Sequence, residues 1–327
     1  MNRPALLATT ALLLAALAMT PVAAVTQATA APTATTTDQG SDVYAFRVGE
    51  IRVTALSDGT VPMDLHKLLQ RTTPGRIDAL LQRNFQSNPV EASINAYLIE
   101  FPGRTVLVDT GSGELFGPAT GGKLVASLAR VGTTPDKITD VLITHVHSDH
   151  AGGLVRGGQR VFTNATVHVA KADLDFFADR SNAERTHYDA QYFDIAATTM
   201  KPYLDAGKVQ PFTKDGPILP GITATLHPGH TPGSAFFTLE SKGDRIVFVG
   251  DIVHSAAVQF PDVATTIAYD QDADRAASAR ASAFMDFARS QALVAAPHMP
   301  FPGIGRVRAE GQGFAWVPVT YVNRAGN

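Results

Sequence analysis

Short apolar runs bounded by turn residues recur along the chain and predict two groups of β-strands. The strands expected from this pattern are residues 51–56, 92–101, 104–108, 141–144, 166–170, 223–226, 234–239, 245–249, 293–296 and 314–319. Pro102-Gly103 lies between two of these runs and predicts a hairpin, and Ser57-Asp58-Gly59 predicts a turn after the first run.

Helical spacing of apolar residues predicts helices over residues 122–131, 171–178 and 272–290. The last of these has the strongest pattern, and Asp272 is a plausible N-cap. The residues near one side of this helix are Ala276, Arg280, Phe284, Phe287 and Ala288. Two groups of strands, each followed by helices, favour two sheets packed face to face with helices outside.

The first 30 residues have the features of a secretory signal peptide. Arg3 gives a basic start, residues 5–18 form an apolar run, and Ala28-Thr29-Ala30 matches a cleavage site of small residues. The apolar run is shorter than the ~20 residues of a spanning helix, which disfavours an uncleaved membrane anchor. We therefore expect an exported protein, either periplasmic or secreted.

Residues 31–42 are rich in Thr, Ala, Ser and Gly and are expected to form a flexible leader. No repeat or second linker follows, so residues 43–327 are expected to form one domain. Of the 327 residues, 45% are hydrophobic and 17% are charged, which is typical of a globular protein with a sizeable core.

The charge and the cysteine count exclude several classes of protein. The net charge is −3 and no basic stripe is present, which argues against nucleic-acid binding. No long apolar span follows residue 30, so we expect no membrane association of the domain. The chain has no cysteine, so any metal site must use nitrogen and oxygen ligands.

The densest group of potential metal ligands is the run THVHSDH at residues 144–150. A strand that ends in a tight turn can aim alternate side chains at one point. We therefore expect His145 and His147 to share one direction, and Asp149 and His150 to reach a neighbouring point. That arrangement could supply ligands to two adjacent metal ions, and it favours metal binding over a chance grouping of histidines.

The motif His145-x-His147-x-Asp149-His150 resembles the signature of the metallo-β-lactamase superfamily. Other motifs of that family follow the same order in this chain. These further residues are Asp109 in VDTG, His230 in GHTPG, Asp251 in VGD and His298 in APH. The motifs extend over residues 109–298, and the strand pattern extends the resemblance to nearly all of the chain after the leader.

The resemblance implies an α/β fold of the αββα sandwich type, with two divalent metal ions at one edge. The implied ligands are His145, His147 and His230 for the first ion, and Asp149, His150 and His298 for the second. Asp251 would bridge both ions, and a hydroxide shared by them would attack the substrate, with Asp149 and Asp251 as the catalytic carboxylates. Imidazole and carboxylate ligands suit zinc, and also manganese, cobalt or iron.

Several assignments remain open at this stage. Asp109 is expected to orient a ligand histidine, although it could simply cap a turn. His227 lies three residues before His230 and could compete as a ligand, but the GHTPG context favours His230. The histidines outside the motifs are expected to be structural or exposed, and they are His66, His168, His187 and His254.

Further segments resemble methyl parathion hydrolase and its relatives, which hydrolyse organophosphate triesters, aryl esters or lactones. These segments are residues 55–60, 115–118, 256–260, 300–305 and 308–311. The resemblance implies a homodimer and a pocket lined by Phe116, Phe177 and Phe193, although each of these could be an ordinary core residue. At Phe177 the phosphotriesterase has tryptophan, so organophosphate triesters are expected only as side substrates.

We therefore expect a two-metal hydrolase of small molecules that cleaves lactones or aryl esters. The absence of cysteine, the presence of Asp251 and the presence of His147 argue against several other branches of the superfamily. One alternative is a mononuclear iron oxidoreductase on the same fold, resembling a sulfur dioxygenase, which His150, Asp251 and His298 disfavour. The other is a non-catalytic metal-binding protein, which the complete set of ligands disfavours.

Overall fold

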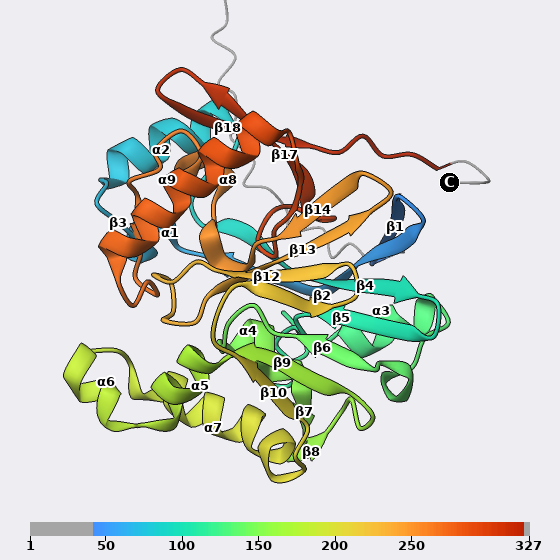
Figure 1. Ribbon diagram of the computed structural model, residues 1–327. Coiled ribbons are helices and arrows are strands. Elements are labelled where there is room, and N and C mark those ends of the chain that lie inside the picture. The colour runs from blue at the N-terminus through green and yellow to red at the C-terminus, as the bar shows by residue number, and fades with distance from the viewer. Residues whose placement is uncertain (1–41, 324–327) are drawn as a thin grey trace, which may run out of the picture. The chain divides into compact units, whose positions relative to one another are not determined.

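The computed structural model describes residues 42–323. The predicted signal peptide and all but the last residue of the predicted leader lie outside this range. Within residues 42–323, no helix has both the length and the apolar character needed to cross a membrane. The described chain groups into one compact unit (Figure 1).

Two mixed sheets of seven strands form the centre of the fold. In spatial order, the first contains β1 (Val43–Val48), β2 (Ile51–Met63), β4 (Val90–Phe101), β5 (Arg104–Val108), β6 (Asp140–Leu142), β9 (Thr166–Ala170) and β10 (Val209–Phe212). The second contains β11 (Gly216–Leu219), β12 (Ile222–Leu226), β13 (Ala235–Ser241), β14 (Asp244–Phe248), β16 (Leu293–Ala295), β17 (Ile304–Glu310) and β18 (Gly313–Pro318). Two short pairs are β3 (Leu69–Gln70) with β15 (Thr266–Ile267) and β7 (Val155–Arg156) with β8 (Gln159–Arg160).

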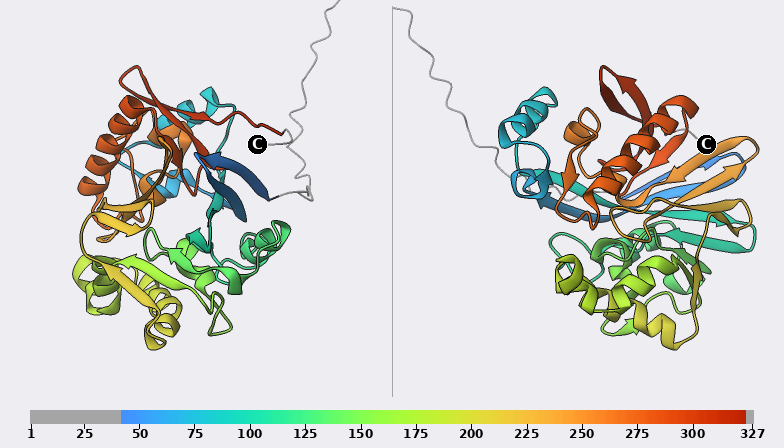
Figure 2. Two further views of the ribbon diagram at one scale, coloured as in Figure 1. Left: turned by 45° about the vertical axis from the view of Figure 1, so that its right-hand side comes forward. Right: turned by 60° about the vertical axis from the view of Figure 1, so that its left-hand side comes forward.

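Helices cover the outer faces of these sheets. The α-helices are α1 (Leu65–Leu68), α2 (Pro74–Arg83), α3 (Leu124–Arg130), α4 (Ser148–Ala151), α5 (Lys171–Ala178), α6 (Ser181–Thr186), α7 (Ala190–Asp205), α8 (Ala256–Gln259) and α9 (Ala273–Ser290). Short 3-10 turns are η1 (Pro135–Lys137), η2 (Gly152–Leu154) and η3 (Gly250–Ile252). Figures 1 and 2 show α9 outside one sheet and α5 and α7 outside the other.

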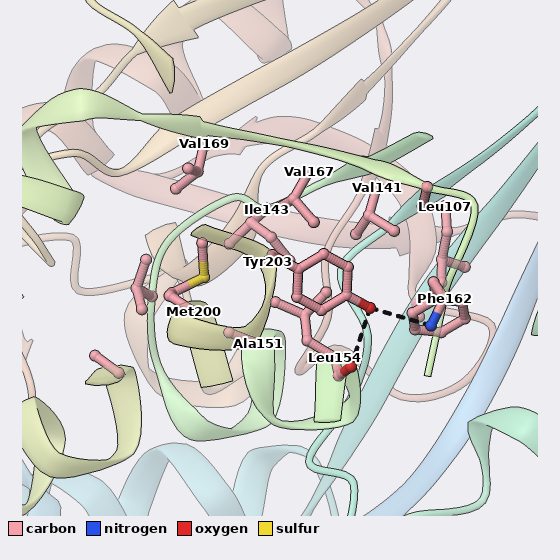
Figure 3. Packing of buried hydrophobic residues seen from close by; sticks show 14 of the residues in the cluster. Leu107, Val141, Ile143, Ala151, Leu154, Phe162, Val167, Val169, Met200 and Tyr203 are labelled. Atoms are coloured by element: carbon pink, nitrogen blue, oxygen red, sulfur yellow. Dashed lines mark hydrogen bonds between the residues drawn. The ribbon is translucent and has the colours of Figure 1, made fainter. Parts of the chain in front are cut away.

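The alternation of side chains along β4 explains the layers. Tyr97 and Ile99 point into a buried cluster between the two sheets, where they meet Phe248. Leu98 points the other way, into a cluster that α7 closes with Met200 and Tyr203. Figure 3 shows the Tyr203 hydroxyl in this cluster, bonded to the Phe162 amide at 3.0 Å and the Leu154 carbonyl at 3.0 Å.

The second sheet has a separate outer core under α9. Asp272 caps this helix by accepting a hydrogen bond from the amide of Arg275 at 3.0 Å, as predicted. Phe284 and Phe287 of the helix pack with Phe236 of the sheet. Helices, two sheets and helices form four layers, so the predicted αββα arrangement of the α/β class is confirmed.

Most predicted elements match observed ones, including the hairpin of β4 and β5 and the helices α3, α5 and α9. The predicted turn at residues 57–59 is wrong, because β2 continues through it with a register shift between Ser57 and Gly59. The pattern also did not reveal α7, in which Pro202 and neighbouring threonines weaken the helical signal.

The strands bring the candidate ligands to one edge of the sandwich. β5 and β6 run parallel in the first sheet, and β14 and β16 run parallel in the second. The ends of these four strands lead directly into segments that contain Asp109, His145, Asp251 and His298. A rigid scaffold thus presents its polar side chains on the loops that follow the strands.

Candidate metal centre

The first group of candidate ligands is formed by His145, His147, His230 and Asp251. All four are buried, and their ligand atoms lie within 4.8 Å of one another. His147 Nδ1 is 3.0 Å from His145 Nε2 and 3.1 Å from His230 Nε2. Asp251 Oδ2 lies 3.3 Å from His230 Nε2 and 3.6 Å from His145 Nε2. The side chains therefore converge on a common centre.

The second group is formed by Asp149, His150 and His298, whose ligand atoms also lie within 4.8 Å of one another. The other oxygen of Asp251, Oδ1, lies 3.0 Å from His150 Nε2 and 3.0 Å from His298 Nε2. Asp149 Oδ2 is 3.5 Å from His298 Nε2. Oδ1 of Asp251 therefore faces the second group and Oδ2 the first, although Oδ2 also lies 3.2 Å from His298 Nε2, so this carboxylate is placed to be shared by two cations.

The chemistry of these donors fits divalent cations. His150 Nε2 and Asp251 Oδ1 are buried and, although they lie 3.0 Å apart, neither forms a hydrogen bond within residues 42–323. Buried polar atoms without a partner are rare, and one explanation is a bound ion. Nitrogen and carboxylate donors in two groups of three or four suit zinc and similar metals.

Each ligand imidazole is oriented by a partner on its outer nitrogen. His147 Nε2 lies 2.7 Å from the Tyr188 hydroxyl, which donates in turn to the Tyr269 carbonyl at 2.8 Å. His230 Nδ1 lies 2.8 Å from Asp270 Oδ1. These bonds direct Nδ1 of His147 and Nε2 of His230 towards the centre, because each ring has only one nitrogen left.

The remaining three imidazoles are held in the same way, and His145 Nδ1 lies 3.1 Å from the Thr144 hydroxyl. His150 Nδ1 lies 2.8 Å from Asp109 Oδ2, and the same carboxylate accepts hydrogen bonds from the amide and hydroxyl of Thr144. His298 Nδ1 lies 2.9 Å from the Ser93 carbonyl. The structure therefore places Asp109 behind a ligand histidine, where the sequence predicted an orienting role.

Glycine allows two chain segments to approach behind this centre. A Cβ atom on Gly153 would lie 1.9 Å from the Thr110 carbonyl oxygen, and one on Gly152 would lie 2.4 Å from the Ser112 carbonyl oxygen. Residues with side chains cannot occupy these positions without moving the backbone. The glycine pair after the histidine motif thus keeps α4 close to the segment that contains Asp109.

The buried carboxylates dominate the electrostatics. Burial lowers the pKa of His145 and of His147 well below the usual value, so these rings are neutral. Although burial acts in the same direction on His230, its hydrogen bonds to Asp251 and Asp270 raise its pKa to about 9. Despite its own burial, Asp251 has a pKa well below the usual value because of the surrounding imidazoles, His150 first among them. A cation would offset this negative charge in place of protons.

A cavity of about 420 Å³ opens onto both ligand groups. His147, Asp149 and Asp251 lie at its polar side, and Leu115 and Phe116 form part of its apolar wall. The structure places Phe116 where the sequence predicted it.

Phe177 and Phe193 lie elsewhere. Both are buried in the core cluster between α7 and the first sheet, with ring centroids 5.3 Å apart. Neither lines the cavity, so the core alternative describes them. Tyr192 and Tyr269 provide the aromatic lining in their place. Phe177 packs edge-on against the ring of His147, with ring centroids 6.0 Å apart, but it does not reach the cavity.

One histidine that was expected to be structural or exposed belongs to this site. His254 is buried, lines the cavity and places Nε2 3.1 Å from Asp251 Oδ2. Its ring stacks on His298 with centroids 5.0 Å apart. Its position three residues after Asp251 was the only signal in the sequence. His227, by contrast, stacks on Phe236 outside both ligand groups.

One helical residue that the sequence did not indicate connects two of the loops that contain candidate ligands. Asp173 of α5 accepts hydrogen bonds from the amide of Val146 at 2.9 Å and the hydroxyl of Thr231 at 3.0 Å. Burial raises the pKa of Asp173 to about 6. This carboxyl therefore joins the His145–His147 segment to the loop that contains His230.

Comparison with known proteins identifies the family. Residues 90–298 match the model of the metallo-beta-lactamase superfamily. The chain therefore belongs to this superfamily, and the resemblance seen in the sequence is confirmed.

Two solved structures match nearly the whole described chain. A structure described as hydrolase AbOPH in the beta lactamase superfamily is 32% identical with a TM-score of 0.82, and the match covers 87% of this chain and 100% of that one. AidC, described as a dizinc quorum-quenching lactonase in complex with a product, is 26% identical with a TM-score of 0.78. That match covers 86% of this chain and 99% of AidC.

Curated relatives match over a shorter region. The N-acyl homoserine lactonase AiiA of Bacillus thuringiensis subsp. kurstaki is 28% identical over 175 residues, which are 47% of this chain and 61% of AiiA. The atrochrysone carboxyl ACP thioesterase of Passalora fulva is 28% identical over 162 residues, which are 49% of this chain and 38% of the thioesterase. The chain thus spans less than two thirds of the length of these relatives.

Proposed function

We propose that the protein is a metal-dependent hydrolase that holds two divalent cations, with zinc as the expected metal, and cleaves lactones and aryl esters. Organophosphate triesters are expected as side substrates. The main observation is that Asp251 presents one carboxylate oxygen to each of two adjacent ligand groups. The similarity to AidC, a dizinc lactonase, supports both the metal count and the substrate class.

A pair of bound divalent cations supplies a strong nucleophile from water near neutral pH and stabilises negative charge on a substrate oxygen. The first cation would be held by His145, His147 and His230, the second by Asp149, His150 and His298, and both by Asp251. Asp149 is more exposed than Asp251, with 17% of its side chain accessible to solvent, and it faces the cavity. Its carboxylate is therefore placed to accept a proton from water and to pass it to the leaving group.

Two tyrosines are placed to bind the substrate. Burial raises the pKa of Tyr192 and of Tyr269, so both hydroxyls remain protonated at neutral pH. Each lines the cavity and can donate a hydrogen bond to a carbonyl or leaving-group oxygen. Leu115 and Phe116 on the apolar wall suit an acyl or aryl group. The cavity of about 420 Å³ is within the range of ligand sites.

A substrate panel on metal-quantified protein tests the proposal. We expect about two divalent metal ions per chain, and hydrolysis of a lactone or a p-nitrophenyl ester that is lost on exhaustive chelation and restored by zinc. Full activity after chelation would refute metal dependence. Oxygen consumption with a thiol persulfide would indicate the oxidoreductase alternative. Failure of fully metal-loaded protein to cleave any member of the panel would indicate a non-catalytic metal-binding protein.

We also propose that the protein is exported and forms a homodimer. The first proposal is supported by the sequence of residues 1–30, and the second by the resemblance to methyl parathion hydrolase. N-terminal sequencing after expression in a secreting bacterial host tests export, and a mature chain that retains Met1 would contradict it. Light scattering of the purified protein measures its mass, and a monomer at all concentrations would contradict the dimer.

A further inference from the structure

A fully buried arginine lies on the inward face of α9. Arg280 shares this face with apolar residues such as Ala276 and Phe284 and is among the largest side chains with no exposed surface. Burying a guanidinium is strongly unfavourable unless its donors are paired. An apolar side chain would suit this position if packing were the only requirement, so the choice of arginine indicates a specific role for its donors.

The guanidinium contacts four polar groups, all within residues 252–270. Its Nε donates to the Ile252 carbonyl at 2.7 Å, and Nη1 donates to the carbonyls of Thr265 at 2.6 Å and Val263 at 3.1 Å. Its Nη2 lies 3.7 Å from Asp270 Oδ2. The donors of one planar group therefore reach three separate segments of chain.

Two of these contacts lead directly to candidate metal ligands. Ile252 follows Asp251 in η3, where Asp251 itself has non-helical backbone angles of φ −90° and ψ 43°. The Ile252 carbonyl bonded to Arg280 therefore belongs to the irregular turn that aims the Asp251 carboxylate at both ligand groups. Because Asp251 departs from helical backbone angles in that turn, a side chain that fixes the carbonyl of the next residue restrains its geometry.

The other contact acts on His230. Asp270 is buried, and its Oδ1 holds His230 Nδ1 at 2.8 Å, while its Oδ2 accepts the Ile267 amide at 3.0 Å and faces Arg280. The guanidinium and the Ile267 amide thus hold the oxygen of Asp270 that does not meet His230, which fixes the orientation of the carboxylate. A fixed partner on Nδ1 orients the His230 ring and leaves Nε2 facing the other candidate ligands.

We propose that Arg280 is a positioning residue of the metal centre, because a single guanidinium fixes both the turn of Asp251 and the Asp270–His230 pair. This inference rests on the proposed metal-dependent function. A lysine at this position could not reproduce it fully, because an ammonium is a point donor and lacks the planar fork that reaches both contacts. The alternative is a purely structural role, in which Arg280 only joins α9 to the adjacent loops.

Metal binding to the folded protein separates these two roles. We would compare the wild type with Arg280→Met, which keeps an unbranched side chain but removes the donors, and with Arg280→Lys. Tyr203→Phe is the matched control, because it removes two buried hydrogen bonds, to Phe162 and Leu154, that involve no candidate ligand (Figure 3). Chelator competition gives the affinity for zinc, and the visible absorption of bound Co²⁺ reports ligand geometry.

We expect Arg280→Met to weaken zinc binding by about 10–100-fold and to alter the Co²⁺ spectrum, as loss of an outer partner of a metal ligand does. Arg280→Lys should show a smaller loss of zinc affinity and a smaller change in the Co²⁺ spectrum than Arg280→Met. Tyr203→Phe should unfold at lower denaturant concentration with unchanged affinity and spectrum. The double variant Arg280→Met with Asp270→Asn should lose less affinity than the product of the single losses, because the two residues act on one histidine.

A folded Arg280→Met protein with wild-type zinc affinity and Co²⁺ spectrum would overturn the inference. If Arg280→Met does not fold, a double-mutant cycle of Arg280→Lys with Asp270→Asn provides the test. Losses of zinc affinity that are independent in this cycle would equally overturn the inference. Failure of the wild type to bind zinc would refute the proposed function itself, and would appear before any variant is compared. The two failures are therefore distinguishable.

Discussion

Replacing Tyr188 with phenylalanine removes a single hydroxyl that controls the orientation of a candidate ligand. The hydroxyl lies 2.7 Å from His147 Nε2 and donates to the Tyr269 carbonyl at 2.8 Å. Because the hydroxyl donates to Tyr269, it accepts from His147 Nε2, and Nδ1 of His147 is left to face His145 and His230. Without the hydroxyl, the imidazole of His147 can rotate or change its tautomer, and the site loses a preorganised donor.

The size of both expected effects follows from these contacts. Loss of two largely buried hydrogen bonds, each with a net value of about 0.5–1.5 kcal/mol, should lower the unfolding free energy of the metal-free protein by about 1–3 kcal/mol. Loss of an outer partner should weaken metal binding by about 10–100-fold. That decrease corresponds to about 1.4–2.8 kcal/mol of binding free energy.

Tyr203→Phe is again the control, because the Tyr203 hydroxyl makes two buried hydrogen bonds that do not involve a ligand histidine. Denaturant unfolding of the metal-free variants should show similar losses of stability for Tyr188→Phe and Tyr203→Phe. Zinc affinity, measured by chelator competition, should fall only in Tyr188→Phe. Equal zinc affinity in the two variants would show that the tyrosine does not orient His147, and the reasoning about outer partners would fail.

Three further variants test other parts of the site and fold. Asp251→Ala should bind no more than one zinc ion and lose hydrolysis, because it removes a ligand common to both groups, and retained activity would contradict this assignment. His254→Phe preserves the ring stacked on His298 but removes the contact to Asp251 Oδ2, so zinc affinity should fall by about tenfold, as the loss of a hydrogen bond to a charged group predicts. Asp140→Asn should destabilise the protein at pH 7. Burial raises the pKa of Asp140, but the hydrogen bond with His168 and other contacts lower it below the usual value, so the ionised carboxylate stabilises the fold. The stability that the ionised Asp140 contributes is complete above the usual aspartate pKa and is lost as pH falls through the lowered value. The difference in unfolding free energy between the wild type and Asp140→Asn should therefore be smaller at pH 3 than at pH 7.

The sequence could predict that the candidate ligands converge, because four of them are close together in the chain. His145, His147, Asp149 and His150 lie in one run after an apolar strand, and the spacing itself indicates convergence. The strands around them follow simple apolar runs, since both faces of strands such as β4 are buried. The turn predicted at residues 57–59 failed for a non-local reason, because the Asp58 side chain turns inward to bind a distant loop.

The outer partners of the ligands could not be predicted in the same way. Tyr188, Asp270 and Asp173 lie far from the ligands in sequence, and none belongs to a motif with characteristic spacing. Each acquires its role only when packing brings its element against the centre. Arg280 is an intermediate case, because an arginine in an otherwise apolar helical stripe is visible in the sequence, but its acceptors are not.

The structure also separates the residues that hold metal from those that shape the cavity wall. Asp58 accepts hydrogen bonds from the amides of Ser112, Gly122 and Leu124, and so fastens both ends of the loop between them. Phe116 and its neighbour in that loop, Leu115, line the cavity, and neither is a candidate ligand or one of the orienting partners described above. Substitutions there can change the acyl or aryl group that fits while the ligand geometry stays intact. Substrate range and metal affinity should therefore vary independently in this fold.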